Sequence, residues 1–288
     1  MIKYFSFAGL LLLAFGCHTT SDKPHTVATK ATPGPTRLYA QAVGDSFSVF
    51  VSLPEDYHPQ EKKSFPVVYL LDANLYFDIM ATTIRKYAEV GLAPEVILVG
   101  IGYKDFPTMD SLRNRDDTYP QAIPEYEMSV SGGADKFLSF INNELVPYID
   151  HTYQTDTTKR VLMGHSLGGY FTMYALEQSL SGKAHKLHNY IAASPSLHYN
   201  NYYLLHQLKT STVRQPDNTK VYITYGGLEN SNDPASITLD SLSAQLAAVF
   251  PKHANGGVTY KYDIYSSLDH MDTQLPTFIK GMQWVFAP

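Results

Sequence analysis

One serine stands out because the residues around it could make it a nucleophile. Ser166 lies in the segment Gly-His-Ser-Leu-Gly-Gly at residues 164–169, which follows a short apolar run and opens a stretch of helical periodicity. A Gly-x-Ser-x-Gly turn between a strand and a helix holds its serine in a strained conformation with the hydroxyl exposed. The backbone N–H of Leu167 begins the helix, so it can donate to the oxygen that becomes negative in a tetrahedral intermediate. The motif predicts acyl-transfer chemistry at Ser166, with a helix-capping serine as the alternative and His165 as part of the scaffold.

A serine hydroxyl becomes nucleophilic when a histidine accepts its proton, and the sequence offers 11 histidines. In hydrolases with this turn the chain order is serine, acid, histidine, which leaves His253 and His270. His270 lies in a polar loop after the last predicted strand, from which an imidazole can reach the tops of the strands. His253 lies in a turn that leads into that strand, at its opposite end. We therefore predict His270 as the base.

The third group is an acid that accepts the imidazole N–H and stabilises the imidazolium. Glu229 directly follows the predicted strand at residues 220–225, so it lies at the carboxyl end of that strand. Asp233 is the rival, although it would serve equally well as a helix N-cap. Asp269 and Asp272 flank the histidine, but neighbours in sequence seldom reach its far ring nitrogen. We predict Glu229 as the acid, with Asp233 as the alternative.

The pattern of apolar residues predicts the elements that position these groups. From residue 38 onward, short apolar runs alternate with longer segments of helical period, which indicates an α/β fold with a mostly parallel central sheet and helices on both faces. Alternating apolar positions predict an antiparallel edge strand at residues 47–53. We predict six further strands, at residues 67–71, 96–101, 160–163, 190–193, 220–225 and 258–265. We predict helices at residues 75–90, 134–149, 167–180, 236–250 and 275–285.

Residues 103–133 lack a clear period and contain several prolines, so we predict a long loop over the carboxyl ends of the strands. Within this loop, Arg113, Arg115 and Asp116 could bind a charged substrate or pin the loop through ion pairs. A group of tyrosines leaves a similar choice, between a site for carbohydrate or catecholate and packing around a helix: Tyr199, Tyr202 and Tyr203.

The composition narrows the classes of partner. The chain has 288 residues, of which 44% are hydrophobic and 17% charged, which suits one or two globular domains. Its 22 basic and 27 acidic side chains give a net charge of -5, so no basic field exists that could hold a nucleic acid. One cysteine excludes a disulfide framework and a cysteine-rich zinc or iron–sulfur site. We expect no nucleic-acid partner, and the predicted chemistry needs no metal or cofactor.

The amino-terminal residues predict export. Lys3 precedes an apolar run at residues 5–15, which is too short to span a bilayer but has the length of a signal peptide core. Gly16 before Cys17 resembles a bacterial lipoprotein cleavage box, in which the cysteine becomes the lipidated first residue. Residues 1–17 are therefore predicted as a lipoprotein-type signal peptide, with plain secretion and an unmodified Cys17 as the alternative.

The residues after Cys17 complete the predicted domain organisation. Residues 18–35 are rich in threonine, proline, serine and lysine and predict a flexible tether. Residues 36–288 are predicted to form a single catalytic domain. With a lipid on Cys17, this domain would be anchored to a membrane and would face the periplasm or the cell exterior.

Several segments together resemble the putative esterase family of α/β hydrolases, which contains esterase D, feruloyl esterases, enterochelin-type siderophore esterases and mycolyltransferases. They occur in order along most of the chain, at residues 51–57, 67–72, 113–116, 133–137, 144–149, 164–169, 193–197 and 225–229. The resemblance implies the α/β-hydrolase fold, with Ser166 as nucleophile, His270 as base and Glu229 as acid. It also implies a second oxyanion donor, the backbone N–H of Asn74, in the turn after the strand at residues 67–71.

Two departures from the family pattern bear on the oxyanion turn and the substrate. Ala73 stands where relatives often carry glycine, and His198-Tyr199 stands where the siderophore-like branch tends to have tryptophans. The second departure alters one predicted wall of the substrate site. The candidate substrate contacts are Asp72, Arg113, Arg115 and Tyr199.

The function expected from these residues is two-step ester hydrolysis by an exported serine esterase, whose substrate is a small-molecule ester such as a siderophore lactone or an acylated carbohydrate. An acyltransferase of the mycolyltransferase type would use the same triad with an acceptor hydroxyl in place of water. A serine peptidase shares the turn and the chain order, and a surface lipoprotein could use the pocket only to bind a ligand. The complete set of serine, histidine and acid favours an enzyme over the last alternative.

Overall fold

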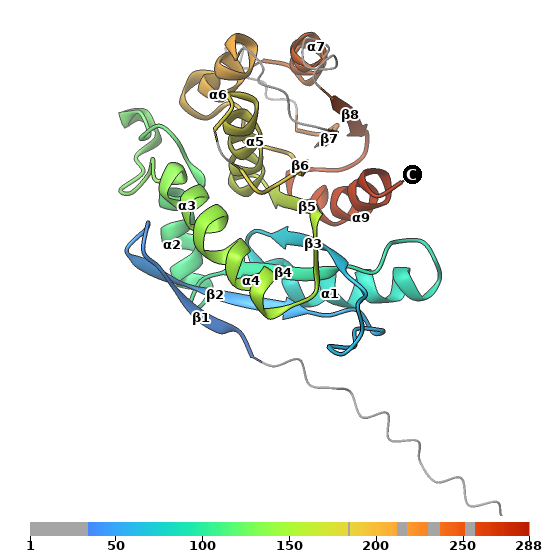
Figure 1. Cartoon of the computed structure of the whole chain (residues 1–288). Helices are drawn as coiled ribbons and strands as arrows, with labels where there is room; N and C mark the ends of the chain where they lie inside the picture. The colour runs from blue at the N-terminus through green and yellow to red at the C-terminus, as the bar shows by residue number, and fades with distance from the viewer. Residues whose placement is uncertain (1–33, 184, 212–217, 230–236, 251–256, 288) are drawn as a thin grey trace, which may run out of the picture. The chain divides into compact units, whose positions relative to one another are not determined.

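Eight strands of the described residues form one sheet, whose order brings distant parts of the chain side by side (Figure 1). The computed structural model describes residues 34–183, 185–211, 218–229, 237–250 and 257–287. The strands are β1 (Thr36–Ala40), β2 (Asp45–Ser52), β3 (Phe65–Leu70), β4 (Ile97–Gly102), β5 (Thr155–His165), β6 (Asn189–Ala193), β7 (Thr219–Gly226) and β8 (Val258–Tyr265). Their order across the sheet is β1-β2-β4-β3-β5-β6-β7-β8. The predicted signal peptide, including Cys17, and the tether up to residue 33 lie outside the described residues.

Strand β2 lies inside the sheet, which corrects the edge position predicted for residues 47–53. β2 pairs antiparallel with β1 on one side and with β4 on the other. β1 was not predicted, because it is short and Ala40 is its only buried residue. The neighbouring pairs from β4 to β8 across the sheet are all parallel. The carboxyl ends of β3, β5, β6, β7 and β8 therefore meet at one edge of the sheet.

Helices cover both faces of the sheet. Successive side chains of a strand point to opposite faces, so Val68 and Leu70 of β3 join one apolar core while Val67 and Tyr69 join another. The core with Val68 includes α1 (Ala73–Glu89) and α9 (Gln274–Val285). The core with Val67 includes α3 (Ala134–Phe140), η2 (Ile141–Leu145), α4 (Val146–Thr152), α5 (Leu167–Leu180), α6 (Tyr199–Thr210) and α7 (Leu239–Val249). This arrangement confirms the predicted α/β fold.

Residues 103–133 contain a helix where a long loop was predicted. This helix, α2, spans Phe106–Asp117, and a short turn, η1, follows at Pro124–Tyr126. The Asp105 side chain accepts a hydrogen bond from the Thr108 N–H at 2.9 Å, and Pro107 occupies the first turn, where its missing N–H is not needed. The prediction failed because two of the three buried residues of α2 are aspartates, so no apolar period marks the helix.

The other predicted elements lie close to their expected positions. β5 begins at Thr155 rather than at residue 160, and the helix predicted at residues 134–149 continues through α4 to Thr152. No helix within the described residues has both the length and the apolar character that crossing a membrane requires.

Candidate active site

The turn at Ser166 has the predicted strand-turn-helix structure. β5 ends at His165, α5 begins at Leu167, and Ser166 between them has φ 59° and ψ -117°. This region is sparsely populated for a residue with a Cβ, so the surrounding structure must hold the strain. A Cβ on Gly164 would collide with the backbone carbonyl of Gly168, which is why the turn needs glycine there. The serine hydroxyl is thereby presented at the carboxyl edge of the sheet.

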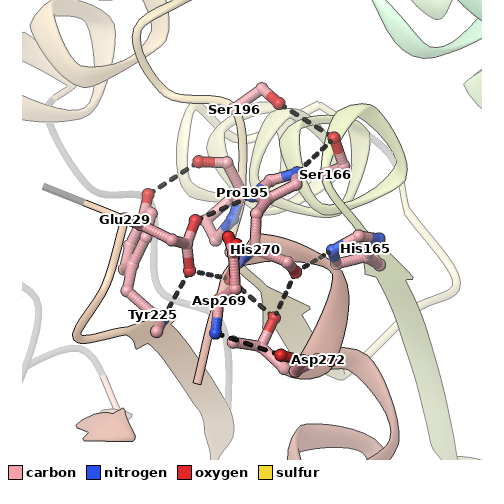
Figure 2. A network of polar contacts seen from close by, with 12 residues as sticks. His165, Ser166, Pro195, Ser196, Tyr225, Glu229, Asp269, His270 and Asp272 are labelled. Atoms are coloured by element: carbon pink, nitrogen blue, oxygen red, sulfur yellow. Dashed lines mark hydrogen bonds and ion pairs between the residues drawn. The ribbon is translucent and has the colours of Figure 1, made fainter. Parts of the chain in front are cut away.

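The structure brings the three predicted triad residues into contact (Figure 2). The Nε2 atom of His270 lies 3.0 Å from the Oγ atom of Ser166, and its Nδ1 atom lies 2.7 Å from the Oε2 atom of Glu229. An ionised carboxylate only accepts hydrogen bonds, so a neutral His270 carries its proton on Nδ1. Nε2 is then free to accept the proton of Ser166. This geometry is the one that serine nucleophile catalysis requires.

Close contacts beyond the ends of β7 and β8 bring Glu229 and His270 together. The Gly227 N–H donates to the carbonyl oxygen of Tyr265 at 2.8 Å, and the Leu228 N–H donates to that of Leu268 at 3.1 Å. A Cβ on Gly226 would collide with the Leu268 carbonyl, so only glycine permits this approach. The two strand-end loops are thus held together up to the residues that carry the acid and the base.

Three donors surround the carboxylate of Glu229, whose side chain is 10% exposed. Besides His270, the hydroxyl of Ser194 donates to Oε1 at 2.6 Å, and the backbone N–H of Gly226 donates to the same oxygen. Burial alone would raise the pKa of Glu229, but these hydrogen bonds, with that from His270 the largest, hold its pKa below the ordinary value. Glu229 is therefore ionised at neutral pH.

The aspartates that flank His270 stabilise the backbone of its turn. His270 begins a single turn of 3-10 helix, η3 (His270–Asp272). The Asp269 side chain accepts from the His270 N–H, and the Asp269 N–H donates to Asp272 Oδ2 at 3.3 Å, which forms a capping box. Both carboxylates thus accept hydrogen bonds from backbone N–H groups, while Glu229 contacts the imidazole.

The two predicted oxyanion donors lie at the amino ends of two helices. Leu167 is the first residue of α5, and Asn74 is the second residue of α1, so neither backbone N–H has a partner within its own helix. The Asn74 side chain pairs with the backbone of Tyr103, accepting from its N–H at 2.7 Å and donating to its carbonyl at 3.1 Å. These contacts fix the start of α1 against the end of β4. The oxyanion role of both donors stays a prediction.

Asp72 and Arg113 form a buried ion pair beside this turn. Asp72 is 4% exposed and has a positive φ of 51°, and the start of α1 follows it directly. Arg113 donates through Nε to Asp72 Oδ1 at 2.9 Å and through Nη2 to Asp72 Oδ2 at 2.7 Å. Burial opposes the charge on Arg113, but Asp72 raises the pKa of the guanidinium above its ordinary value. Of the two roles left open for Arg113, the structure shows the ion pair. Contact with substrate stays a prediction for both residues.

Arg115 is also held by carboxylates. Its Nε donates to Asp116 Oδ1 at 2.8 Å, and its Nη1 donates to Asp45 Oδ2 at 3.0 Å. The Tyr103 hydroxyl donates to the second oxygen of Asp116 at 3.0 Å. Arg115 therefore ties α2 to the start of β2, which again matches the ion-pair alternative.

Tyr199 packs in the core, which corrects its assignment as a substrate contact. It is 1% exposed, and its hydroxyl donates to the carbonyl of Pro120 at 2.9 Å. Its ring packs against Tyr126 and Tyr170, with centroids 5.3 and 5.2 Å away. A residue that is 1% exposed offers almost no surface to a ligand in this conformation. Of the two roles left open for Tyr199, the structure shows packing.

Three polar residues of the site were not singled out by sequence analysis. Ser194 is fully buried and donates to Glu229, and its Oγ atom lies 2.7 Å from the Oγ1 atom of Thr273. Ser196 donates its backbone N–H to the Ser166 carbonyl at 3.0 Å, and its Oγ atom lies 3.3 Å from that of Ser166. The family-like segment at residues 193–197 was a signal for the two serines, whereas nothing in the sequence marked Thr273.

Two alternatives from the sequence fall on residues that the structure does not describe. Asp233, the rival acid, and His253, the rival base, lie outside the described residues. Among the side chains that are described, no group of three or more His, Cys, Asp and Glu residues could hold a metal ion.

A mostly parallel sheet with a serine, a histidine and a carboxylate in contact at its carboxyl edge is the architecture of an α/β hydrolase. The chain belongs to the "Putative esterase" family, whose model matches residues 40–278. The ferri-bacillibactin esterase BesA of Bacillus subtilis (strain 168) is 38% identical over 171 residues, which are 56% of this chain and 57% of that protein. The siderophore triacetylfusarinine C esterase of Aspergillus fumigatus is 29% identical over 198 residues, 65% of each protein.

A solved structure is similar over a larger share of the chain. The IroE-like serine hydrolase from Shewanella oneidensis superposes with a TM-score of 0.70 at 26% identity, covering 87% of this chain and 79% of that one. In sequence, the matches to BesA and to the fusarinine esterase each span less than two thirds of those relatives. Their substrates are therefore a starting point for a proposal about this chain.

Proposed function

We propose that the protein is an exported serine esterase that hydrolyses a carboxylic ester through Ser166, His270 and Glu229. The observation that carries the proposal is the unbroken contact from Ser166 through His270 to Glu229 at a strained strand-to-helix turn. Membership of the esterase family supports the same class of reaction.

The proposed reaction has two steps that use the same groups. Ser166 Oγ attacks the ester carbonyl while His270 Nε2 takes its proton, and Glu229 stabilises the resulting imidazolium. The N–H groups of Leu167 and Asn74 donate to the oxyanion of the tetrahedral intermediate. The imidazolium then protonates the leaving alcohol, which departs from the acyl-enzyme. Water, deprotonated by His270, releases the acid and restores Ser166.

The names of the relatives support a siderophore lactone as the substrate. One curated relative described above is named a siderophore esterase and the other a ferri-bacillibactin esterase, and each matches more than half of this chain. An acylated carbohydrate is the alternative that the sequence raised. A panel of catecholate lactones, feruloyl esters and acetylated sugars tests the choice, and the largest kcat/KM is expected for a lactone.

The central experiment compares the wild type with Ser166→Ala on p-nitrophenyl acetate. We expect the variant to lose about 10³- to 10⁶-fold in kcat, because the nucleophile is absent. Circular dichroism and the unfolding midpoint would establish that the variant is folded. Full activity of a folded Ser166→Ala protein would overturn the assignment.

Two further measurements separate the neighbouring functions. Covalent labelling of the wild type by a fluorophosphonate is expected, and its absence would favour a ligand-binding protein over an enzyme. Product analysis with added sugar acceptors is expected to yield the free acid. Transfer of the acyl group to the acceptor would favour an acyltransferase.

We also propose that Cys17 is lipidated and that the catalytic domain is held at a membrane on the periplasmic or exterior side. The support is the layout of residues 1–17 and the polar segment that follows. In cells fed a labelled fatty acid, the wild type is expected to carry label in the membrane fraction. Cys17→Ser should carry none, and a labelled Cys17→Ser protein would contradict the anchor.

A further inference from the structure

His165 is a buried histidine that lies directly before the nucleophile, and the proposed reaction does not use it. It is 2% exposed, and Figure 2 shows its ring on the side of the site where the backbone of His270 lies. Its Nε2 atom lies 2.8 Å from the carbonyl oxygen of His270, and its Nδ1 atom lies 3.2 Å from the hydroxyl of Tyr76. Both ring nitrogens therefore have a partner inside the protein.

The partners of His165 determine which nitrogen carries the proton. A carbonyl oxygen only accepts, so Nε2 must donate to His270, and Nδ1 must accept from Tyr76. Burial lowers the pKa of His165 to about 4 and raises that of Tyr76 to about 12, so both groups are neutral near pH 7. His165 is thus a fixed neutral donor to the backbone of His270.

Two buried hydroxyls connect this carbonyl with the acid. Ser194 Oγ donates to Glu229 at 2.6 Å, and the single proton of Thr273 Oγ1 can go either to the His270 carbonyl, 3.1 Å away, or to Ser194 Oγ, 2.7 Å away. With the direct contact between His270 and Glu229, these residues form a ring of close polar contacts that includes the base and the acid. His165 attaches this ring to β5, the strand that ends directly before Ser166.

We propose that His165 is a positioning residue, whose Nε2–H fixes the His270 backbone and so places the imidazole between Ser166 and Glu229. The base needs such support because its turn is only three residues long and its capping box, formed by Asp269 and Asp272, bonds the turn to itself. The bond from His165 is a direct link between that turn and the nucleophile strand. Because a misplacement of about 1 Å in a reacting group can reduce rates about 100-fold, this link affects catalysis without contact with substrate.

The inference rests on the proposed function, and the test keeps the two apart. The readouts are the rate constant for inactivation by diisopropyl fluorophosphate, which needs no knowledge of the natural substrate, and kcat and KM on p-nitrophenyl acetate. The variants are His165→Leu, which removes both ring nitrogens, His165→Gln, whose amide nitrogen reaches about as far as Nε2, and His165→Asn, whose amide reaches only as far as Nδ1. His188→Leu, in a partly buried histidine just before β6, is the matched control.

We expect His165→Leu and His165→Asn to lose about 10- to 100-fold in the inactivation rate constant and in kcat, with KM within about twofold. His165→Gln is expected to recover most of this loss, and His188→Leu to react at the wild-type rate. A purely structural role would lower the unfolding midpoint of all His165 variants while the folded fraction kept its rate constants.

Wild-type rate constants in folded His165→Leu or His165→Asn would overturn the inference and leave the esterase proposal intact. If His165→Leu does not fold, equal rates for the glutamine and asparagine variants would have the same effect. A wild type that does not react with the fluorophosphate would instead contradict the proposed function.

Discussion

The side chain of Glu229 has three hydrogen-bond partners, whereas those of His270 and Ser166 have two each. Its Oε1 accepts from the Ser194 hydroxyl at 2.6 Å and from the Gly226 N–H, while Oε2 faces Nδ1 of His270 at 2.7 Å. Each of these hydrogen bonds favours the ionised form of Glu229, because a hydrogen bond to a carboxylate is stronger than one to the protonated acid. The orientation of the imidazole therefore depends on a carboxylate that is itself fixed.

Replacement of Glu229 tests this dependence. We expect Glu229→Gln to reduce kcat by about 10³- to 10⁴-fold, because an amide nitrogen in place of Oε2 would favour the tautomer with the proton on Nε2. The measurement is kcat on p-nitrophenyl acetate, with Asp233→Ala as the companion variant. A larger loss at Asp233 than at Glu229 would transfer the role of the acid to Asp233.

The burial of His165 also predicts how the free energy of unfolding depends on pH. Its pKa is about 4 in the folded protein against an ordinary value of 6.5, so below pH 6.5 the unfolded chain binds a proton that the folded protein does not. The free energy of unfolding should therefore fall as pH decreases from 6.5 to 4, by about 3 kcal/mol from this group. Urea unfolding at several pH values would show a smaller fall for His165→Gln, and equal slopes would contradict the depressed pKa.

At the scale of elements, the start of α1 is fixed from two sides. Asp72 pairs with Arg113 of α2, and the Asn74 side chain pairs with the backbone of Tyr103 after β4. The N–H groups of this turn therefore have a defined direction. The position of one predicted oxyanion donor depends on α2, a helix that touches neither Ser166 nor His270 through any hydrogen bond among the described residues.

Removal of Arg113 should expose this dependence. Arg113→Met leaves the Asp72 carboxylate buried without its ion-pair partner, so we expect a loss of about 3 kcal/mol in the free energy of unfolding. Asp72→Asn in the same chain should recover part of that loss. Arg85→Met, at an exposed position on α1, is the control and should change stability by less than about 0.5 kcal/mol. Equal effects at positions 113 and 85 would show that the ion pair contributes little.

Some elements of the fold could be predicted from the sequence and others could not. The strand-turn-helix at Ser166 was predictable because its motif is local and its flanking segments are strongly patterned. Glu229 and His270 followed from chain order and from the strands that precede them. α2 was missed because its buried face carries Asp116 and Asp117.

Contacts that need the assembled sheet were beyond the sequence. The bond from His165 to the backbone of His270 joins residues 105 positions apart, and that from Ser194 to Glu229 joins residues 35 apart. Residue type alone does not say which hydroxyls meet. The burial of Tyr199 was undetermined for the same reason, because a tyrosine suits both a binding site and a core.

At the scale of the whole molecule, two apolar cores lie on opposite faces of one sheet, and β5 contributes side chains to both. Leu162 of β5 belongs to one core, and Val161 and Met163 to the other. All eight described strands belong to this sheet, and the helices α1 to α9 contribute residues to its two covers. The chemistry of the site therefore rests on a structure that begins at Thr36.

This organisation predicts that the residues before the sheet are dispensable for catalysis. A chain that starts at residue 34 should fold cooperatively and match the full chain in kcat on a soluble ester, within about twofold, because every predicted catalytic group lies in the sheet, its loops or the helices that cover it. Steady-state kinetics and thermal unfolding of both chains would provide the comparison. A large loss of activity in the shorter chain would assign a catalytic role to residues 1–33.

The strands that carry the proposed triad are far apart in the order of synthesis. Ser166 and His270 are separated by 104 positions, and Glu229 and His270 by 41. A growing chain emerges from its amino end, so the nucleophile leaves the ribosome long before the base that must activate it. If the predicted export takes place before the chain has folded, the chain crosses the membrane without an assembled triad. Esters in the compartment where it is made then never meet a serine paired with its base, because the loop after the last strand joins the site only on folding.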